Sequence, residues 1–65
     1  MKSFGENIKK FRLLRNLSQK KLGELLGFSA RTISDWECGN TEPNIPTIKK
    51  LANILQISIE ELFDF

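Results

Sequence analysis

The segment SQKKLGELLGFSARTISDWECG, residues 18–39, decides how this chain folds. Ser18 and Ser29 are suited to begin helices, because a serine hydroxyl accepts a hydrogen bond from a free backbone N–H of the first turn. Gly27 is suited to end the first helix, because glycine readily adopts the left-handed conformation that closes one. We therefore expect helices over residues 19–26 and about 29–38, joined by a tight turn, which is a helix-turn-helix arrangement.

Apolar spacing and capping signals predict three more helices around this pair. Residues 4–14 carry apolar side chains at three- and four-residue steps, namely Phe4, Ile8, Phe11 and Leu14. After a polar loop, Asn44 is a suitable cap for a fourth helix with Pro46 in its first turn and a buried stripe of Ile48, Leu51, Ala52 and Leu55. The SIEE motif of residues 58–61 has capping-box spacing and opens a short last helix. The expected fold is all-α, one compact five-helix domain over residues 1–65.

Composition excludes several classes of function. The single cysteine, Cys38, cannot form an internal disulfide, and with no histidine we expect no metal site and no cofactor. The missing histidine also removes the commonest general base, so we do not expect an enzyme. No apolar run approaches about 18 residues, and the N-terminus lacks the apolar core of a signal peptide. These features indicate a cytoplasmic protein that does not enter membranes.

The charges are divided unevenly along the chain. Residues 1–31 carry eight Lys or Arg side chains against two acids, a net charge of +6, whereas residues 32–65 carry two against six, a net charge of −4. Such asymmetry favours a protein with one face that meets a polyanion. The alternative is an ordinary solvated surface.

Several residues lie at spacings typical of a known family. Counting from Gln19, a small residue (Gly23) is fifth, glycine (Gly27) is ninth and a β-branched residue (Ile33) is fifteenth. The motif W-E-x-G is present as Trp36–Glu37–Cys38–Gly39, Pro43 follows, and a tail of the form L-a-x-x-L-x-I-S-x-x-E-L runs from Leu51 to Leu62. Over nearly its whole length the chain resembles the Cro/lambda-repressor type of helix-turn-helix protein, the xenobiotic-response-element (XRE) family.

The resemblance implies a lambda-repressor-like fold and a role for its apolar and charged residues. Leu22, Leu25 and Leu26 would form the apolar face of the first helix of the pair, and Leu22, Leu26, Phe28, Ile33 and Trp36 would fix the angle between the two helices. Gly23, where the family more often has alanine, would permit their close approach. Arg12 would pair with Glu37, the alternative being two unrelated surface charges.

The resemblance also implies sequence-specific binding of double-stranded DNA by a transcriptional regulator, most simply a repressor on a palindromic operator. The helix at about 29–38 would enter the major groove, with base contacts from Ser29, Ala30, Arg31 and Asp35. Arg31 suits the O6 and N7 atoms of guanine. Asp35 could accept a hydrogen bond from cytosine N4, but we favour its holding Arg31 as an i, i+4 pair. Phosphate contacts are expected from Gln19, Thr32, Ser34, Asn40, Thr41, Arg15 and Lys20.

Family members usually bind DNA as two-fold dimers, so a homodimer is expected. Its surface would be the acidic C-terminal part, with Ile57, Ile59, Phe63 and Phe65. The alternative function is a protein-interaction module of the same fold, with little or no DNA reading and an unidentified protein partner. Loss of sequence preference in Arg31→Ala, with folding retained, would favour the first function.

Overall fold

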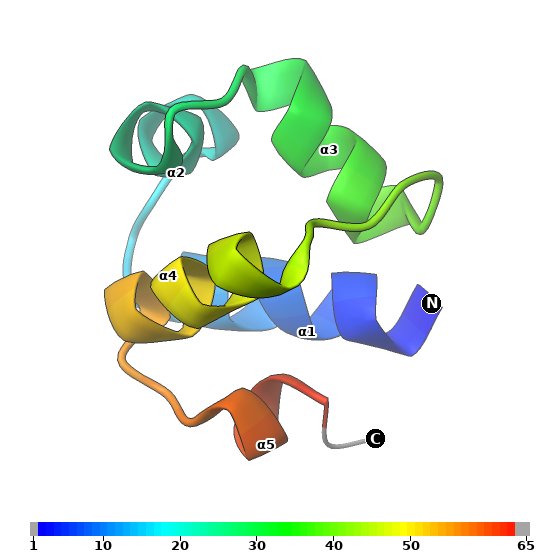
Figure 1. Cartoon of the computed structure of the whole chain (residues 1–65). Coiled ribbons are helices and arrows are strands. Elements are labelled where there is room, and N and C mark those ends of the chain that lie inside the picture. The colour runs from blue at the N-terminus through cyan, green and yellow to red at the C-terminus, as the bar shows by residue number, and fades with distance from the viewer. Residues whose placement is uncertain (1, 64–65) are drawn as a thin grey trace.

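The computed structural model of this chain describes residues 2–63, which form helices and connecting turns without a strand. In chain order the helices are α1 (Lys2–Leu14), α2 (Gln19–Leu26), α3 (Ala30–Cys38), α4 (Ile45–Leu55) and α5 (Ile59–Leu62) (Figure 1). The predicted all-α fold and its five helices are confirmed, with α1 beginning two residues earlier than expected.

Side-chain caps begin four of the helices where the sequence predicts them. The capping hydroxyl or amide oxygen accepts a backbone N–H three residues later at each start: Ser18 from Lys21, Ser29 from Thr32, Asn44 from Thr47 and Ser58 from Glu61. At Ser58 the capping box is complete, because its own N–H donates to Glu61 Oε1 at 3.0 Å. These starts are therefore set by local chemistry.

Residues in the left-handed conformation follow four of the helices, α1 to α4. Gly27 and Gly39 have φ of 85° and 81°, as expected for glycine at a helix end. Asn16, after α1, and Gln56, after α4, have φ of 57° and 59°. Gln56 was not predicted in this role, since long side chains seldom adopt left-handed angles.

The hydrophobic core receives side chains from all five helices. Its fully buried members are Ile8, Leu22, Ile33, Leu51, Leu55 and Leu62, and Phe4 and Trp36 complete it. Leu14 does not belong to the core: it is 63% exposed, because α1 ends there before turning toward α2. Leu25 and Phe28 are likewise exposed, although Phe28 still contacts the edge of Trp36.

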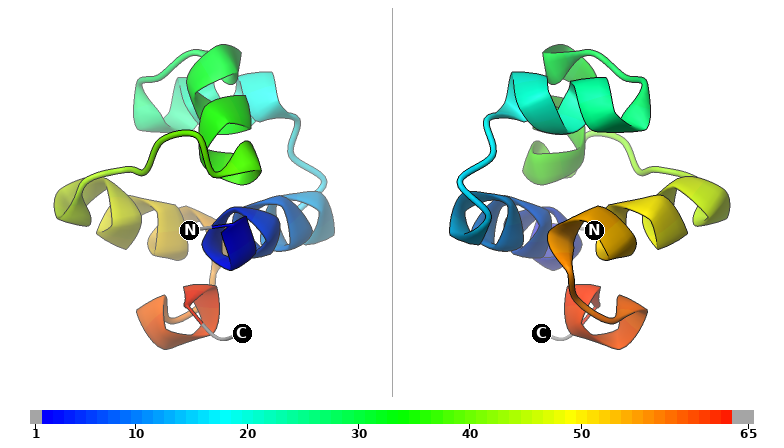
Figure 2. Two further views of the ribbon diagram at one scale, coloured as in Figure 1. Left: turned by 90° about the vertical axis from the view of Figure 1, so that its right-hand side faces the viewer. Right: turned by 90° about the vertical axis from the view of Figure 1, so that its left-hand side faces the viewer.

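The helices form three levels. In Figures 1 and 2, α2 and α3 lie at one end of the molecule, α5 lies at the other, and α1 and α4 lie between them. The exposed Lys20 and Lys21 are thus on α2, and the exposed Glu60 and Glu61 on α5 at the far end. These two lysines and two glutamates therefore lie at opposite ends of the molecule. Among the described residues, no helix has the length and apolar character needed to cross a membrane.

Candidate nucleic-acid interface

The third helix is held from its inner side. Ile33 is fully buried and Trp36 is 3% exposed, so both point into the core beneath α3. The ring of Phe28 meets Trp36 edge to face, with centroids 5.2 Å apart and an interplanar angle of 70°. Because aromatic pairs in this geometry attract each other, Phe28 steadies α3 even though it is itself exposed.

The outer side of α3 carries Arg31 and Asp35. The Arg31 side chain is 87% exposed, and that of Asp35 is 30% exposed. Arg31 Nε lies 3.9 Å from Asp35 Oδ1, too far for a hydrogen bond but close enough for attraction between the charges. The two residues therefore form the predicted i, i+4 pair, while the guanidinium keeps its donors available to a ligand.

The start of α3 is ordered by a pair of hydroxyl groups. Ser29 Oγ accepts the backbone N–H of Thr32 at 3.2 Å and lies 3.1 Å from Thr32 Oγ1. Ala30, Thr32 and Ser34 are half-buried along the flanks of Arg31. Ser29 thus caps α3. A base contact from its hydroxyl would have to form while Oγ still accepts the N–H of Thr32.

An ion pair buried between α1 and α3 fixes the C-terminal end of α3. Arg12 Nε donates to Glu37 Oε2 at 2.6 Å and Nη2 to Oε1 at 3.3 Å, and the two side chains are only 8% and 4% exposed. Arg12 Nη1 also donates to the carbonyl of Leu17 at 2.7 Å, just before α2. The predicted pairing of Arg12 with Glu37 is confirmed. Through Arg12 the network connects α1 to α3 and to Leu17, which lies just before α2.

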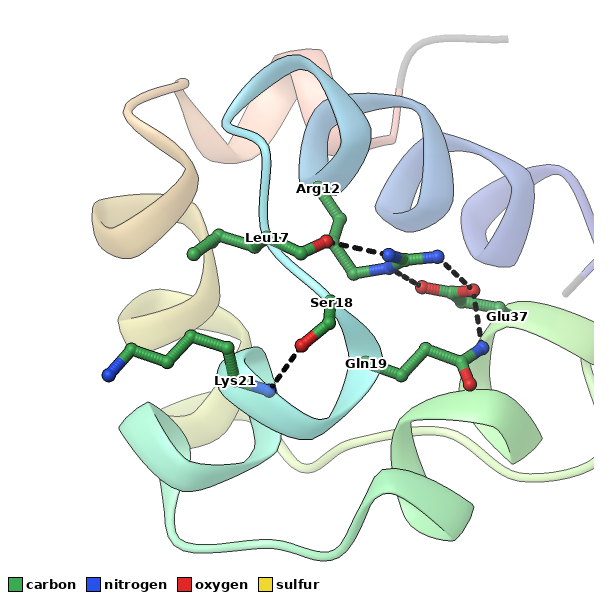
Figure 3. A network of polar contacts seen from close by, with 6 residues as sticks. All are labelled: Arg12, Leu17, Ser18, Gln19, Lys21 and Glu37. Atoms are coloured by element: carbon green, nitrogen blue, oxygen red, sulfur yellow. Dashed lines mark hydrogen bonds and ion pairs between the residues drawn. The ribbon is translucent and has the colours of Figure 1, made fainter.

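Sequence reasoning missed a third member of this network. Gln19 Nε2 donates to Glu37 Oε1 at 3.0 Å, so the amide points toward the ion pair (Figure 3). Gln19 was predicted only as a phosphate contact. Its backbone N–H and one remaining amide proton are the donors left for that purpose. Its position as the first residue of a helix gave no signal of the contact with Glu37.

The other predicted phosphate contacts lie on α2, in the loop after α3 and just after the end of α1. Lys20 is exposed on α2, beside Gln19. The backbone N–H groups of Asn40 and Thr41 donate to the carbonyl of Asp35, so these loop residues offer their side chains instead. Arg15 Nη1 donates to Gln56 Oε1 at 3.1 Å, which places Arg15 beside the C-terminal end of α4. The structure thus gathers most of these residues on α2, α3 and the loop that follows, with Arg15 apart from them.

Comparison with known proteins identifies the family. The helix-turn-helix family matches residues 8–62. The chain belongs to the XRE-type helix-turn-helix family. It is 37% identical over 59 residues to YonR, an SPbeta prophage-derived uncharacterized HTH-type transcriptional regulator of Bacillus subtilis. That alignment covers 91% of this chain and 55% of YonR, so the chain spans about half the length of that relative.

Two solved helix-turn-helix structures match nearly the whole chain. The restriction-modification controller protein C.AhdI from Aeromonas hydrophila superposes with a TM-score of 0.87 at 32% identity, over 95% of this chain and 94% of that one. The P22 c2 repressor protein in complex with a synthetic operator superposes with a TM-score of 0.84 at 37% identity, over 91% and 89% of the two chains. The lambda-repressor-like fold is therefore established.

In this helix-turn-helix protein the predicted dimer residues lie at the end opposite α3. Ile59 is 39% exposed and Phe63 is 37% exposed, whereas Ile57 packs against the core. The ring of Phe63 stacks on that of Phe4, with centroids 4.7 Å apart. Phe65 lies outside the described residues. Ile59 and one face of Phe63 are thus available for association.

Proposed function

We propose that this chain is a transcriptional repressor that binds double-stranded DNA sequence-specifically, with α3 in the major groove. The observation that carries the proposal is the geometry of α3. Ile33 and Trp36 hold the helix from beneath, while the Arg31 side chain extends from the opposite side, 87% exposed. A major groove accommodates an α-helix presented in this way.

Arg31 is the residue that reads bases in this mechanism. Its guanidinium forms a bidentate contact with guanine O6 and N7, which is worth about 1–3 kcal/mol of discrimination against another base. Asp35 keeps the guanidinium in position by charge attraction. Ala30 packs against a thymine methyl group, and Ser29 contributes at the same end of α3.

Phosphate contacts fix the protein on the duplex without reading its sequence. The start of α2 supplies Gln19 and Lys20, because the free N–H groups of a helix N-terminus favour anions. Thr32, Ser34, Asn40 and Thr41 approach the backbone from α3 and its following loop. Arg15, beside α4, adds long-range attraction.

Binding as a homodimer to a palindromic operator extends the site that one short helix can read. Half-sites of such operators lie about 34 Å apart, which is one turn of DNA. Association through Ile59 on α5 and Phe63 directly after it leaves α3 uncovered, because α3 and α5 lie at opposite ends of the molecule (Figure 1). Promoter access is then blocked by occupancy alone.

Selection of bound sequences from random duplexes tests the proposal. We expect a palindromic consensus for the parent chain and loss of preference at one base pair of each half-site for Arg31→Ala. Lys49→Ala on α4 is the matched control, because removing a charge outside α2 and α3 changes affinity for all sequences alike. If the parent chain is folded but shows no sequence preference, the proposed function is wrong and the alternative, a protein-interaction module, is favoured.

A further inference from the structure

One polar contact joins the start of α2 to the end of α3, the two ends that the turn between these helices does not connect. Gln19, the first residue of α2, donates through Nε2 to Glu37, the penultimate residue of α3, at 3.0 Å (Figure 3). The same carboxylate receives two N–H groups of Arg12. Because a carboxylate is a charged acceptor, the contact from Gln19 is stronger than one between neutral groups.

The other ends of α2 and α3 are fixed by the turn itself. The carbonyl of Gly23 accepts the N–H groups of Gly27 and Phe28 at 2.8 and 2.7 Å. A Cβ at Gly23 would lie 2.4 Å from the carbonyl oxygen of Phe28, so the backbones are in direct contact there. The turn therefore fixes the distance between the end of α2 and the start of α3. The angle between the two helix axes depends on the remaining contacts.

Between the turn and Gln19 the two helices meet through apolar side chains. Leu22 and Ile33 are both fully buried. Apolar burial stabilises the pair but is non-directional, so it tolerates small rotations of one helix over the other. The hydrogen bond from Gln19 adds direction at the far ends, where a rotation moves the backbone most.

We propose that Gln19 is a positioning residue, which sets the reading face of α3 relative to the start of α2 by holding Glu37. This inference rests on the proposed DNA-binding function. In that function the phosphate contacts come from the start of α2 and the base contacts from α3. A specific complex therefore needs the two helices at the correct relative position, so that both sets of contacts form at once. A non-specific complex needs only the phosphate contacts.

The distinguishing quantity is the ratio of affinities for the selected operator and a scrambled duplex. A phosphate contact alone contributes to both affinities, and its loss leaves their ratio unchanged. Loss of a positioning contact lowers the affinity for the operator only. For Gln19→Ala we expect the ratio to fall roughly ten-fold, the scale of one hydrogen bond to a charged group, with the helical circular dichroism signal kept.

Gln19→Glu tests the same contact without shortening the side chain. The variant keeps the size of residue 19, removes the amide donor and places a second carboxylate opposite that of Glu37, beside Arg12. We expect its ratio to fall at least as far as that of Gln19→Ala, because repulsion between like charges then replaces a hydrogen bond.

Gln56→Glu is the matched control, since it makes the same change at an exposed residue outside the network. Its ratio should equal that of the parent chain, since the new charge lies beside Arg15, whose attraction acts on both duplexes alike. Equal losses on both duplexes for Gln19→Ala, or a Gln19→Glu ratio equal to that of the parent chain, would overturn the inference. If the alanine variant unfolds, the measurement on Gln19→Glu decides. A parent chain that does not prefer its operator would instead overturn the proposed function.

Discussion

Gly5 of α1 lies directly against the carbonyl of Trp36 in α3. A Cβ at Gly5 would be 2.4 Å from Trp36 O and 2.6 Å from Glu37 O, closer than any side chain tolerates. Glycine in a helix interior lowers stability by about 1 kcal/mol relative to alanine. This cost is offset because only glycine lets α1 approach the C-terminal end of α3 so closely.

Gly5→Ala should therefore destabilise the protein even though alanine is the better helix former. Overpacking costs about 1–3 kcal/mol, and here the clashing atoms belong to the backbone, which cannot rotate away. We expect the free energy of unfolding in urea to fall by about 1 kcal/mol or more. Lys9→Ala, at an exposed position of the same helix, should change it by less than about 0.5 kcal/mol. A Gly5→Ala variant more stable than the parent would show that the approach is looser than described.

Arg12→Met should destabilise strongly, because it leaves the buried carboxylate of Glu37 without its main partner. Removing one member of a buried ion pair costs about 3–5 kcal/mol. Urea unfolding measures the loss. The double variant Arg12→Met, Glu37→Met should recover much of it, since no charge is then left buried. Unchanged stability in the single variant would contradict the role given to the pair.

Salt should weaken DNA binding in proportion to the number of phosphates contacted. For Z contacts the slope of log K against log salt is about −0.9Z. Lys20→Ala should make the slope shallower by about one unit and leave sequence preference intact, whereas Arg31→Ala should relax the preference. Fluorescence anisotropy with a labelled duplex over a range of salt concentrations separates the two effects. A salt-independent binding constant would rule out the assigned phosphate contacts.

Ile59→Asp should shift the protein from dimer to monomer. Ile59 is exposed on α5, so a charge there disturbs association with little effect on the core. Phe63→Asp is a less specific test, because Phe63 also stacks on the buried ring of Phe4. Sedimentation equilibrium measures the state, and circular dichroism verifies that the helices persist. A parent chain that sediments as a monomer at all concentrations would remove the dimer.

Sequence reasoning located the helices because their ends are set by local chemistry. Ser18, Ser29, Asn44 and Ser58 cap helices through their own side chains, and Gly27 closes one by its backbone freedom. Signals of this kind lie within a few residues of the boundary they define. The pairing of Arg12 with Glu37, 25 residues apart, was accessible only through resemblance to a family.

The contacts that sequence reasoning missed depend on how the helices are placed in space. Neither the crowding of Gly5 by Trp36 nor the hydrogen bond from Gln19 to Glu37 follows from periodicity, since both join different helices. Leu14 and Leu25 were misplaced for a related reason. Their spacing fits an apolar stripe, but their side chains lie at the surface, 63% and 50% exposed. The base and phosphate contacts stay predictions.

The hydroxyl of Ser29 limits how the proposed base preference could be changed. Because Ser29 Oγ caps α3 and also lies within hydrogen-bond distance of Thr32 Oγ1, exchanging Ser29 for a residue with a different base preference would weaken the helix that we propose reads the bases. Arg31 does not cap the helix, and its Nε lies 3.9 Å from Asp35 Oδ1, beyond hydrogen-bond distance. Variants with new operator preferences should therefore arise most readily at these two positions, either in a designed library or during divergence of duplicated genes.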